Sequence, residues 1–158
     1  MRYETAPMSP VIKVITTIIV ALTAVLLAIS ILRPPVFIPA MLLGLVTLGC
    51  YLRAPVAYYV SGAGLTVRFH WGRKTFGKIV KVSRIEGSVG FTLRLWGNGG
   101  LFAGTGIFWN RTWGIFRAYV TTSNRSNLLL LETETGNVLI SPANPGDFLD
   151  RLELQQSG

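Results

Sequence analysis

Two uncharged apolar runs near the start of the chain constrain its fold more than any other feature. The first run, from Val14 to Leu32, holds nineteen residues without a charge, a proline or a glycine. As a helix it spans roughly 28 Å, close to the thickness of the hydrocarbon core of a bilayer. The second run, from Val36 to Leu52, holds seventeen uncharged residues and crosses with little tilt. We therefore expect a transmembrane helical hairpin.

The residues around the two runs predict the remaining boundaries. Arg33, Pro34 and Pro35 form the turn between the helices, because the residue before a proline disfavours helical backbone. Residues 1–13 are expected to form an N-terminal segment, 53–57 a linker, 58–155 a soluble domain and 156–158 a tail. A cleaved signal peptide is the alternative for the first run. It is disfavoured because the run is long, lacks a following Ala-x-Ala site and is followed at once by the second run.

Basic residues near the ends of the runs predict the orientation of the hairpin. The connecting turn carries Arg33 alone, whereas four basic residues flank the outer ends: Arg2, Lys13, Arg53 and Arg68. The positive-inside rule then places both termini and the soluble domain in the cytoplasm. The single cysteine, Cys50, excludes an intrachain disulfide and agrees with that compartment.

Beyond Leu52, short alternating and β-branched segments predict about seven strands. In the clearest of them, over residues 65–71, the alternation places Leu65, Val67, Phe69 and Trp71 on one face. Further strands are expected over 58–60, 76–82, 115–122, 127–133 and 137–141, with turns at 72–75 and 134–136. The chain ends in a helix, for which Asn144 is the expected N-cap and Pro145 the first residue.

The glycine-rich middle and the tail of the chain carry a resemblance to a known family. The segments concerned are Leu93-Arg-Leu-Trp-Gly-Asn-Gly-Gly100, Gly104-Thr-Gly-Ile-Phe108 and Ile140-Ser-Pro-Ala-Asn-Pro-Gly-Asp-Phe148. Residues from Tyr58 to Leu154 resemble the bacterial pleckstrin-homology-like (PH-like) family, whose members often carry a two-helix membrane anchor. The resemblance implies an α+β protein of the bacterial cytoplasmic membrane. Its domain would be an antiparallel β-barrel or sandwich with a C-terminal helix.

The segment from Trp96 to Trp113 combines three tryptophans with five glycines. It predicts a long hairpin whose aromatic side chains close the barrel and whose glycines adopt positive φ. Alternatively, the tip from Gly99 to Phe102 is exposed and contacts the headgroups or a membrane subunit. A nucleotide-binding loop is excluded, because Phe102 stands where the last glycine of GxGxxG belongs. The expected interface or partner contacts are Trp96, Leu101, Phe102, Phe108, Trp109 and Trp113.

Charge is unevenly distributed in the soluble part. Residues 66–117 carry nine basic residues and one acid, whereas residues 118–158 carry two basic residues and five acids. The basic part should face an anionic surface such as a cytoplasmic leaflet. By analogy with the basic hairpin of PH domains, the resemblance suggests Arg73, Lys74 and Lys78 as contacts for lipid headgroups. No nucleic-acid-binding motif accompanies these charges.

The sequence lacks the residue sets of catalytic and metal sites. His70 is the one histidine and has neither metal-ligand partners nor a nucleophile at a recognisable spacing. We expect no catalytic residue, metal or cofactor. The expected function is that of a membrane-anchored interaction module, a non-catalytic accessory or scaffolding subunit of a larger membrane complex. The alternative is a module that senses anionic lipid or is oriented by it, through the basic turn and the glycine-aromatic loop.

Overall fold

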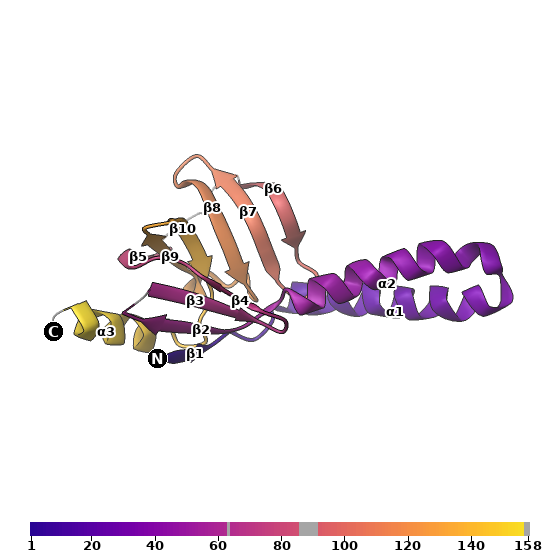
Figure 1. Cartoon of the computed structure of the whole chain (residues 1–158), viewed down its shortest axis with the longest axis horizontal. Coiled ribbons are helices and arrows are strands. Elements are labelled where there is room, and N and C mark those ends of the chain that lie inside the picture. Colours follow the sequence, from indigo (N-terminus) through magenta and orange to yellow (C-terminus); the bar gives the residue numbers. More distant parts are fainter. Residues whose placement is uncertain (63, 86–91, 157–158) are drawn as a thin grey trace.

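The computed structural model describes residues 1–62, 64–85 and 92–156. A helical hairpin projects from one end of a β domain, and the C-terminal helix lies at the opposite end (Figure 1). In chain order the elements are β1 (Arg2–Glu4), α1 (Pro10–Leu32), η1 (Pro34–Val36), α2 (Phe37–Leu52), β2 (Pro55–Ser61), β3 (Gly64–Phe69), β4 (Arg73–Thr75), β5 (Ile79–Arg84), β6 (Thr92–Gly99), β7 (Gly104–Asn110), β8 (Gly114–Val120), η2 (Arg125–Asn127), β9 (Leu129–Thr133), β10 (Gly136–Ile140) and α3 (Pro145–Gln156).

The hairpin consists of two apolar helices that pack on each other and meet the β domain near Thr16 and Tyr51. Helix α1 begins at Pro10, before the predicted Val14, because the Ser9 hydroxyl accepts the Ile12 amide at 3.5 Å and caps the helix. Thr23 and Thr47 meet between the helices with hydroxyl oxygens 3.5 Å apart. In the most apolar stretches of the two helices only 6% and 11% of residues are buried, and both are long and apolar enough to cross a membrane.

The strands form two separate sheets. Of the two expected architectures, a barrel or a sandwich of about seven strands, a closed barrel is not observed among the described residues. One sheet has the order β1-β2-β3-β4 and the other the order β5-β9-β10-β8-β7-β6. All pairs are antiparallel except β8 with β10, which is parallel. Very short strands such as β1 and β4 escaped the sequence patterns, which explains most of the difference in strand number.

The β3–β4 turn differs most from the sequence-based expectation. Residues expected to turn, Arg73–Thr75, pair with β3 as strand β4, and the chain reverses before them. Phe69 donates its amide to the Gly72 carbonyl at 3.0 Å, and Gly72 has a φ of +91°. Trp71 therefore falls in the turn and is 73% exposed, although alternation had placed it on the buried face.

Two further predicted boundaries are wrong, the start of β5 and the start of β2. Strand β5 begins at Ile79, three residues after the predicted start at residue 76. Strand β2 begins at Pro55, so the expected linker over 53–57 shrinks to Arg53 and Ala54. Because that connection is so short, the β domain follows the hairpin almost directly.

The main core lies between the two sheets and beneath α3. Tyr58, Leu65, Leu129, Ile140 and Phe148 are all completely buried in it. Helix α3 begins at Pro145 as predicted, and its Phe148 amide bonds to the Asn144 carbonyl at 3.2 Å. A second apolar cluster, on the six-stranded sheet, consists of Phe116, Ala118, Leu128, Leu130 and Leu139.

The N-terminal segment belongs to the β domain. Strand β1 pairs with β2, and the Tyr3 ring lies 4.6 Å from the Phe148 ring in the core. The next residues contact the chain just after β10 of the other sheet, where the Ala6 amide donates to the Ser141 carbonyl at 2.8 Å. The hairpin is therefore attached to the domain at both of its ends.

Candidate functional site

A cleft of about 770 Å³ lies where the β domain meets the hairpin. Its walls come from three places: the C-terminal end of α2, the β3–β4 turn, and the face of β6, β7 and β8 that turns toward the core. Val46, Gly49 and Cys50 contribute the α2 wall. The cleft thus connects the end of an apolar helix with the interior side of a sheet.

Four cations line this cleft: Arg53, Arg73, Lys74 and Arg117. Arg53 caps α2, Lys74 lies in β4 and Arg117 in β8, and no carboxylate is among the described residues that line the cleft. The Lys74 Nζ lies 5.7 Å and the Arg117 Cζ 5.9 Å from the centroid of the same Phe76 ring. Burial, together with the nearby charges of Arg117 and Arg53, lowers the pKa of Lys74. We call Arg53, Lys74 and Arg117 the cation cluster.

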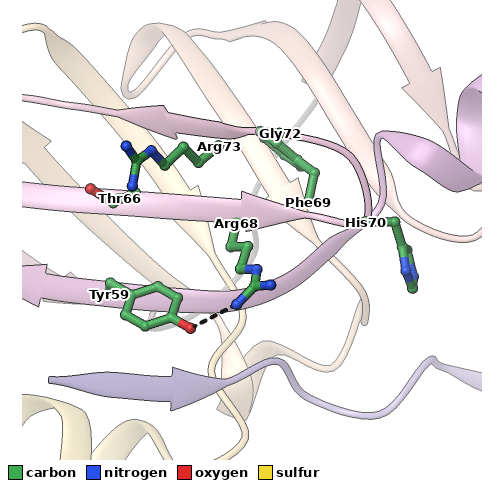
Figure 2. Close-up of a pocket in the computed structure, with 7 residues that line it drawn as sticks. All are labelled: Tyr59, Thr66, Arg68, Phe69, His70, Gly72 and Arg73. Atoms are coloured by element: carbon green, nitrogen blue, oxygen red, sulfur yellow. Dashed lines mark hydrogen bonds between the residues drawn. The ribbon is translucent and has the colours of Figure 1, made fainter.

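Register places Lys74 and Arg73 on opposite faces of β4, although Arg73 lines the inner cleft as well as the groove on the outer face. Lys74 is paired with the buried Val67 and so shares its inward face, whereas Arg73 is paired with the exposed Arg68. Figure 2 shows the outer surface of this sheet, a shallow groove of about 610 Å³ lined by residues that include Thr66 and His70. There the Arg68 Nη1 donates to the Tyr59 hydroxyl at 3.4 Å.

Aromatic side chains surround the cleft at the level of the end of α2. Trp71 and Trp96 both line it and are 73% and 78% exposed. The Trp71 amide donates to the Leu52 carbonyl at 3.0 Å, which fixes the β3–β4 turn to the last turn of α2. His70 stacks on Tyr51 with ring centroids 4.2 Å apart. Tryptophan and tyrosine are the residues typical of a membrane–water interface.

The tip of the β6–β7 hairpin packs on the helices of the same chain. The Phe102 amide donates to the Thr16 hydroxyl at 2.9 Å, and its ring lies 5.3 Å from that of Tyr51. Phe102 adopts a φ of +63°, which is unusual for a residue with a side chain. The Asn98 carboxamide oxygen accepts the Leu101 amide at 3.0 Å and helps to shape the turn. The half-buried tip of the β6–β7 hairpin therefore contacts helices α1 and α2 of the same chain.

The remaining predicted aromatic contacts separate onto the two faces of the six-stranded sheet. Phe108 and Trp113 pack on Phe116 in the second apolar cluster, with ring centroids 5.8 Å and 5.4 Å from it. Trp109 is paired with both Leu93 and Ile115, and these side chains are 39%, 47% and 64% exposed. We call these three residues the apolar row. Ile115 alternates with Arg117, so the row continues the cleft face of the sheet.

The structure does not bring Lys78 to the other two predicted headgroup contacts. Its amide donates to the Glu134 carboxylate at 3.0 Å, and it shares a shallow pocket with Val60 and Leu152 near α3. Arg53 and Arg117 take its place beside Lys74, although no sequence pattern had singled them out as ligands. Among the described residues, no group of three metal-ligating side chains occurs.

Comparison with known proteins assigns the domain to a family. Residues 56–156 match the family described as Bacterial PH domain, which is more than half of the chain. The chain belongs to the bacterial PH domain family. No curated protein and no solved structure matches it. PH-like domains are generally non-catalytic modules that mediate protein or lipid interactions, so this bacterial PH domain is an interaction module in that general sense.

Proposed function

We propose that this protein is a membrane-anchored interaction module whose hairpin crosses the bacterial cytoplasmic membrane and holds the PH domain at its inner surface. The observation that carries the proposal is the apolar surface of the hairpin, which the domain leaves uncovered. Ile31 and Leu32, at the far end of α1, are 82% and 85% exposed. A continuous apolar surface of this kind is not stable in water, whereas a bilayer covers it.

The residues before α1 favour a retained anchor over a cleaved signal peptide. Strand β1 completes the edge of the four-stranded sheet, and Tyr3 is buried against Phe148. Cleavage after α1 would remove this strand and open the core beneath α3. The domain therefore needs the segment that a signal peptidase would release.

The attachment of the domain also supports a cytoplasmic placement. The two-residue connection after α2, the segment before α1 and the β6–β7 tip hold the cleft beside the hairpin. A domain held in this way presents the cation cluster to the nearest leaflet. Anionic headgroups of the cytoplasmic leaflet attract each nearby Lys or Arg by about 1 kcal/mol. The excess of basic residues at the outer ends of the helices favours the same side.

Cysteine accessibility tests the anchor and its orientation. In a chain whose Cys50 is changed to serine, Arg33→Cys places a thiol in the turn between the helices, and Ser126→Cys places one in the domain. We expect the protein to resist alkaline extraction from membranes. An impermeant maleimide should label Arg33→Cys in intact cells and Ser126→Cys only in opened cells. Alkaline release would contradict the anchor, and the reverse labelling pattern would contradict the orientation.

The apolar row favours a role as an accessory subunit that contacts a membrane-protein partner. Along β7, Trp109 lies about 17 Å from Gly104 at roughly 3.3 Å per residue, so the row stands above the cleft on an uncovered sheet face. A partner protein with an apolar surface at the same distance from the hairpin would cover the apolar row. In mild detergent we expect a discrete complex that Ile115→Glu dissociates and Val80→Glu, an equally exposed position on β5, leaves intact. A monomer under these conditions would contradict the proposal.

A further inference from the structure

We propose that the cleft between α2, the β3–β4 turn and strands β6–β8 binds one anionic phospholipid from the surrounding leaflet. The phosphate would lie among Arg53, Lys74 and Arg117, and the acyl chains along the end of α2 between Trp71 and Trp96. This inference rests on the proposed function in one respect, that the hairpin crosses a membrane. It goes beyond a general attraction to the leaflet, because it assigns a single headgroup to a defined site.

The charge of the cleft calls for an anion. The three residues of the cation cluster and Arg73 line the cleft together, and the described residues lining the cleft include no carboxylate that would neutralise them. Like charges held near one another repel, although Arg53 and Lys74 are exposed and only Arg117 is half-buried. The lowered pKa of Lys74 reports this unfavourable environment, which burial and the two guanidinium groups create. A phosphate bound among them would accept charge-assisted hydrogen bonds from both arginines and the lysine.

The apolar part of the cleft indicates that the anion carries a hydrocarbon tail. Val46 and Gly49 of α2 form one wall, and they lie in the apolar run that crosses the membrane in the proposed function. Open space surrounds Gly49, since an added Cβ would meet nothing within 4 Å. Trp71 and Trp96 flank the opening. A volume of about 770 Å³ lies within the range of small-molecule sites, and free phosphate would leave most of it unfilled.

Two glycines of the cleft wall lie where the backbones of β6 and β7 approach each other closely. Gly97 and Gly106 are paired across β6 and β7 and have φ values of +113° and +150°. A Cβ at Gly97 would lie 2.3 Å from the Thr105 carbonyl oxygen, and one at Gly106 would lie 2.1 Å from the Trp96 carbonyl oxygen. Local backbone geometry therefore demands glycine at both positions. Between Trp96 and Arg117 the register places Ile107, whose side chain adds an apolar surface to this wall of the cleft.

The groove on the outer face of the four-stranded sheet fits a phospholipid less well. It contains Arg68 and Arg73, but no residue of α2 lines it, and Arg68 already donates to Tyr59 (Figure 2). It offers cations without an apolar wall that continues into the membrane. The inference is therefore restricted to the inner cleft.

Lipid retention by the full chain tests the proposal. The protein is purified in mild detergent, and native mass spectrometry counts the phospholipids retained after exposure to mixed phosphatidylglycerol and phosphatidylcholine. We expect one phosphatidylglycerol per chain. The pair Lys74→Gln and Arg117→Gln should weaken retention roughly 30-fold, at about fivefold for each cation. The pair Lys78→Gln and Arg84→Gln removes the same charge outside the cleft and should behave like the native chain.

Three outcomes would overturn the assignment. They are equal retention of the two lipids, equal losses in both variant pairs, and displacement of the lipid by inorganic phosphate at comparable concentration. The last result would identify a site for free phosphate. In vesicles whose acyl chains carry bromine near the headgroup, tryptophan fluorescence should be quenched, and Trp71→Phe with Trp96→Phe should abolish most of the quenching. Alkaline extraction of the same preparation reports separately whether the anchor holds.

Discussion

The two ends of the β domain are built from the same pair of sheets and differ in what lies between them. At the end away from the hairpin, α3 and β1 close the gap, and Phe148 and Tyr3 fill it with aromatic side chains. At the end beside the hairpin the sheets separate around the cation cluster and two exposed tryptophans. The stabilising burial is concentrated at one end, which leaves the other end free to expose charges and large aromatic residues for binding.

The largest effect on stability is expected from a truncation at the closed end. Phe148 is completely buried, and Phe148→Ala should lower the free energy of unfolding by about 3–5 kcal/mol, since it leaves a cavity beneath α3. The matched change at the open end is Trp96→Ala, whose side chain is 78% exposed and whose loss should cost less than about 0.5 kcal/mol. Urea unfolding of the full chain in mild detergent measures both. Similar losses of unfolding free energy in the two variants would refute the proposed difference between the closed and the open end.

The next largest loss of stability is expected from a substitution that strains the backbone at the open end. Gly106→Ala places a Cβ 2.1 Å from the Trp96 carbonyl oxygen at a φ of +150°. We expect a loss of about 2–3 kcal/mol and a displaced β6–β7 hairpin. Gly62→Ala is the control, because an added Cβ there meets open space. If Gly106→Ala unfolds like the control, the open end tolerates more rearrangement than its geometry indicates.

Tyr58 offers a pH-dependent test of the closed core. Its hydroxyl donates to the Tyr119 carbonyl at 2.6 Å and accepts the Ser141 amide at 3.2 Å, so Tyr58→Phe should cost about 2 kcal/mol. Burial raises the pKa of Tyr58 to about 12, which favours the neutral hydroxyl in the folded chain. An unfolded tyrosine ionises near pH 10, at about two units lower.

The sign of the pH effect follows from that difference. The advantage of native Tyr58 over Tyr58→Phe should be complete below about pH 10 and should decline as the pH rises toward about 12. Denaturant unfolding of both proteins at neutral and alkaline pH measures the difference between them, so that other titrating groups cancel. A difference that stays constant across this range would show that the hydroxyl does not ionise on unfolding.

The smallest effect is expected where the open end touches the hairpin. Thr16→Val removes the hydroxyl that accepts the Phe102 amide and should weaken this contact by about 1 kcal/mol. Hydrogen exchange at the Phe102 amide should become faster. Thr17→Val changes the next, exposed threonine of α1 and should leave that exchange rate unchanged. Equal rates in all three proteins would show that the tip is held by its ring contact with Tyr51 alone.

Sequence patterns predicted the elements whose signals are local. The alternation of Leu65, Val67 and Phe69 identified a strand with one buried face, and the Asn144-Pro145 pair identified the start of α3. The two apolar runs likewise identified the hairpin. In each case the residues that carry the signal lie within a single helix or strand or at its boundary.

The cleft depends on contacts between distant parts of the chain, so the sequence could reveal only part of it. Arg53 and Arg117 are separated by the whole of β2 to β7, and no local spacing relates them. Lys78 lies four residues after Lys74, but the extended chain carries it toward α3, and net charge does not distinguish the two ends. Trp71 was misplaced because the alternation continues past Phe69 into the turn.

The pairing of β1 with β2 has a consequence for the order in which the chain is made. Residues 2–4 are translated before both helices of the hairpin, whereas their partner strand β2 is translated after them. The Ser141 carbonyl that binds the Ala6 amide comes later still. The N-terminal strand therefore remains unpaired until the hairpin and β2 have both been synthesised. The domain can therefore close only after β10 and the residues that follow it have been synthesised, long after the hairpin is complete.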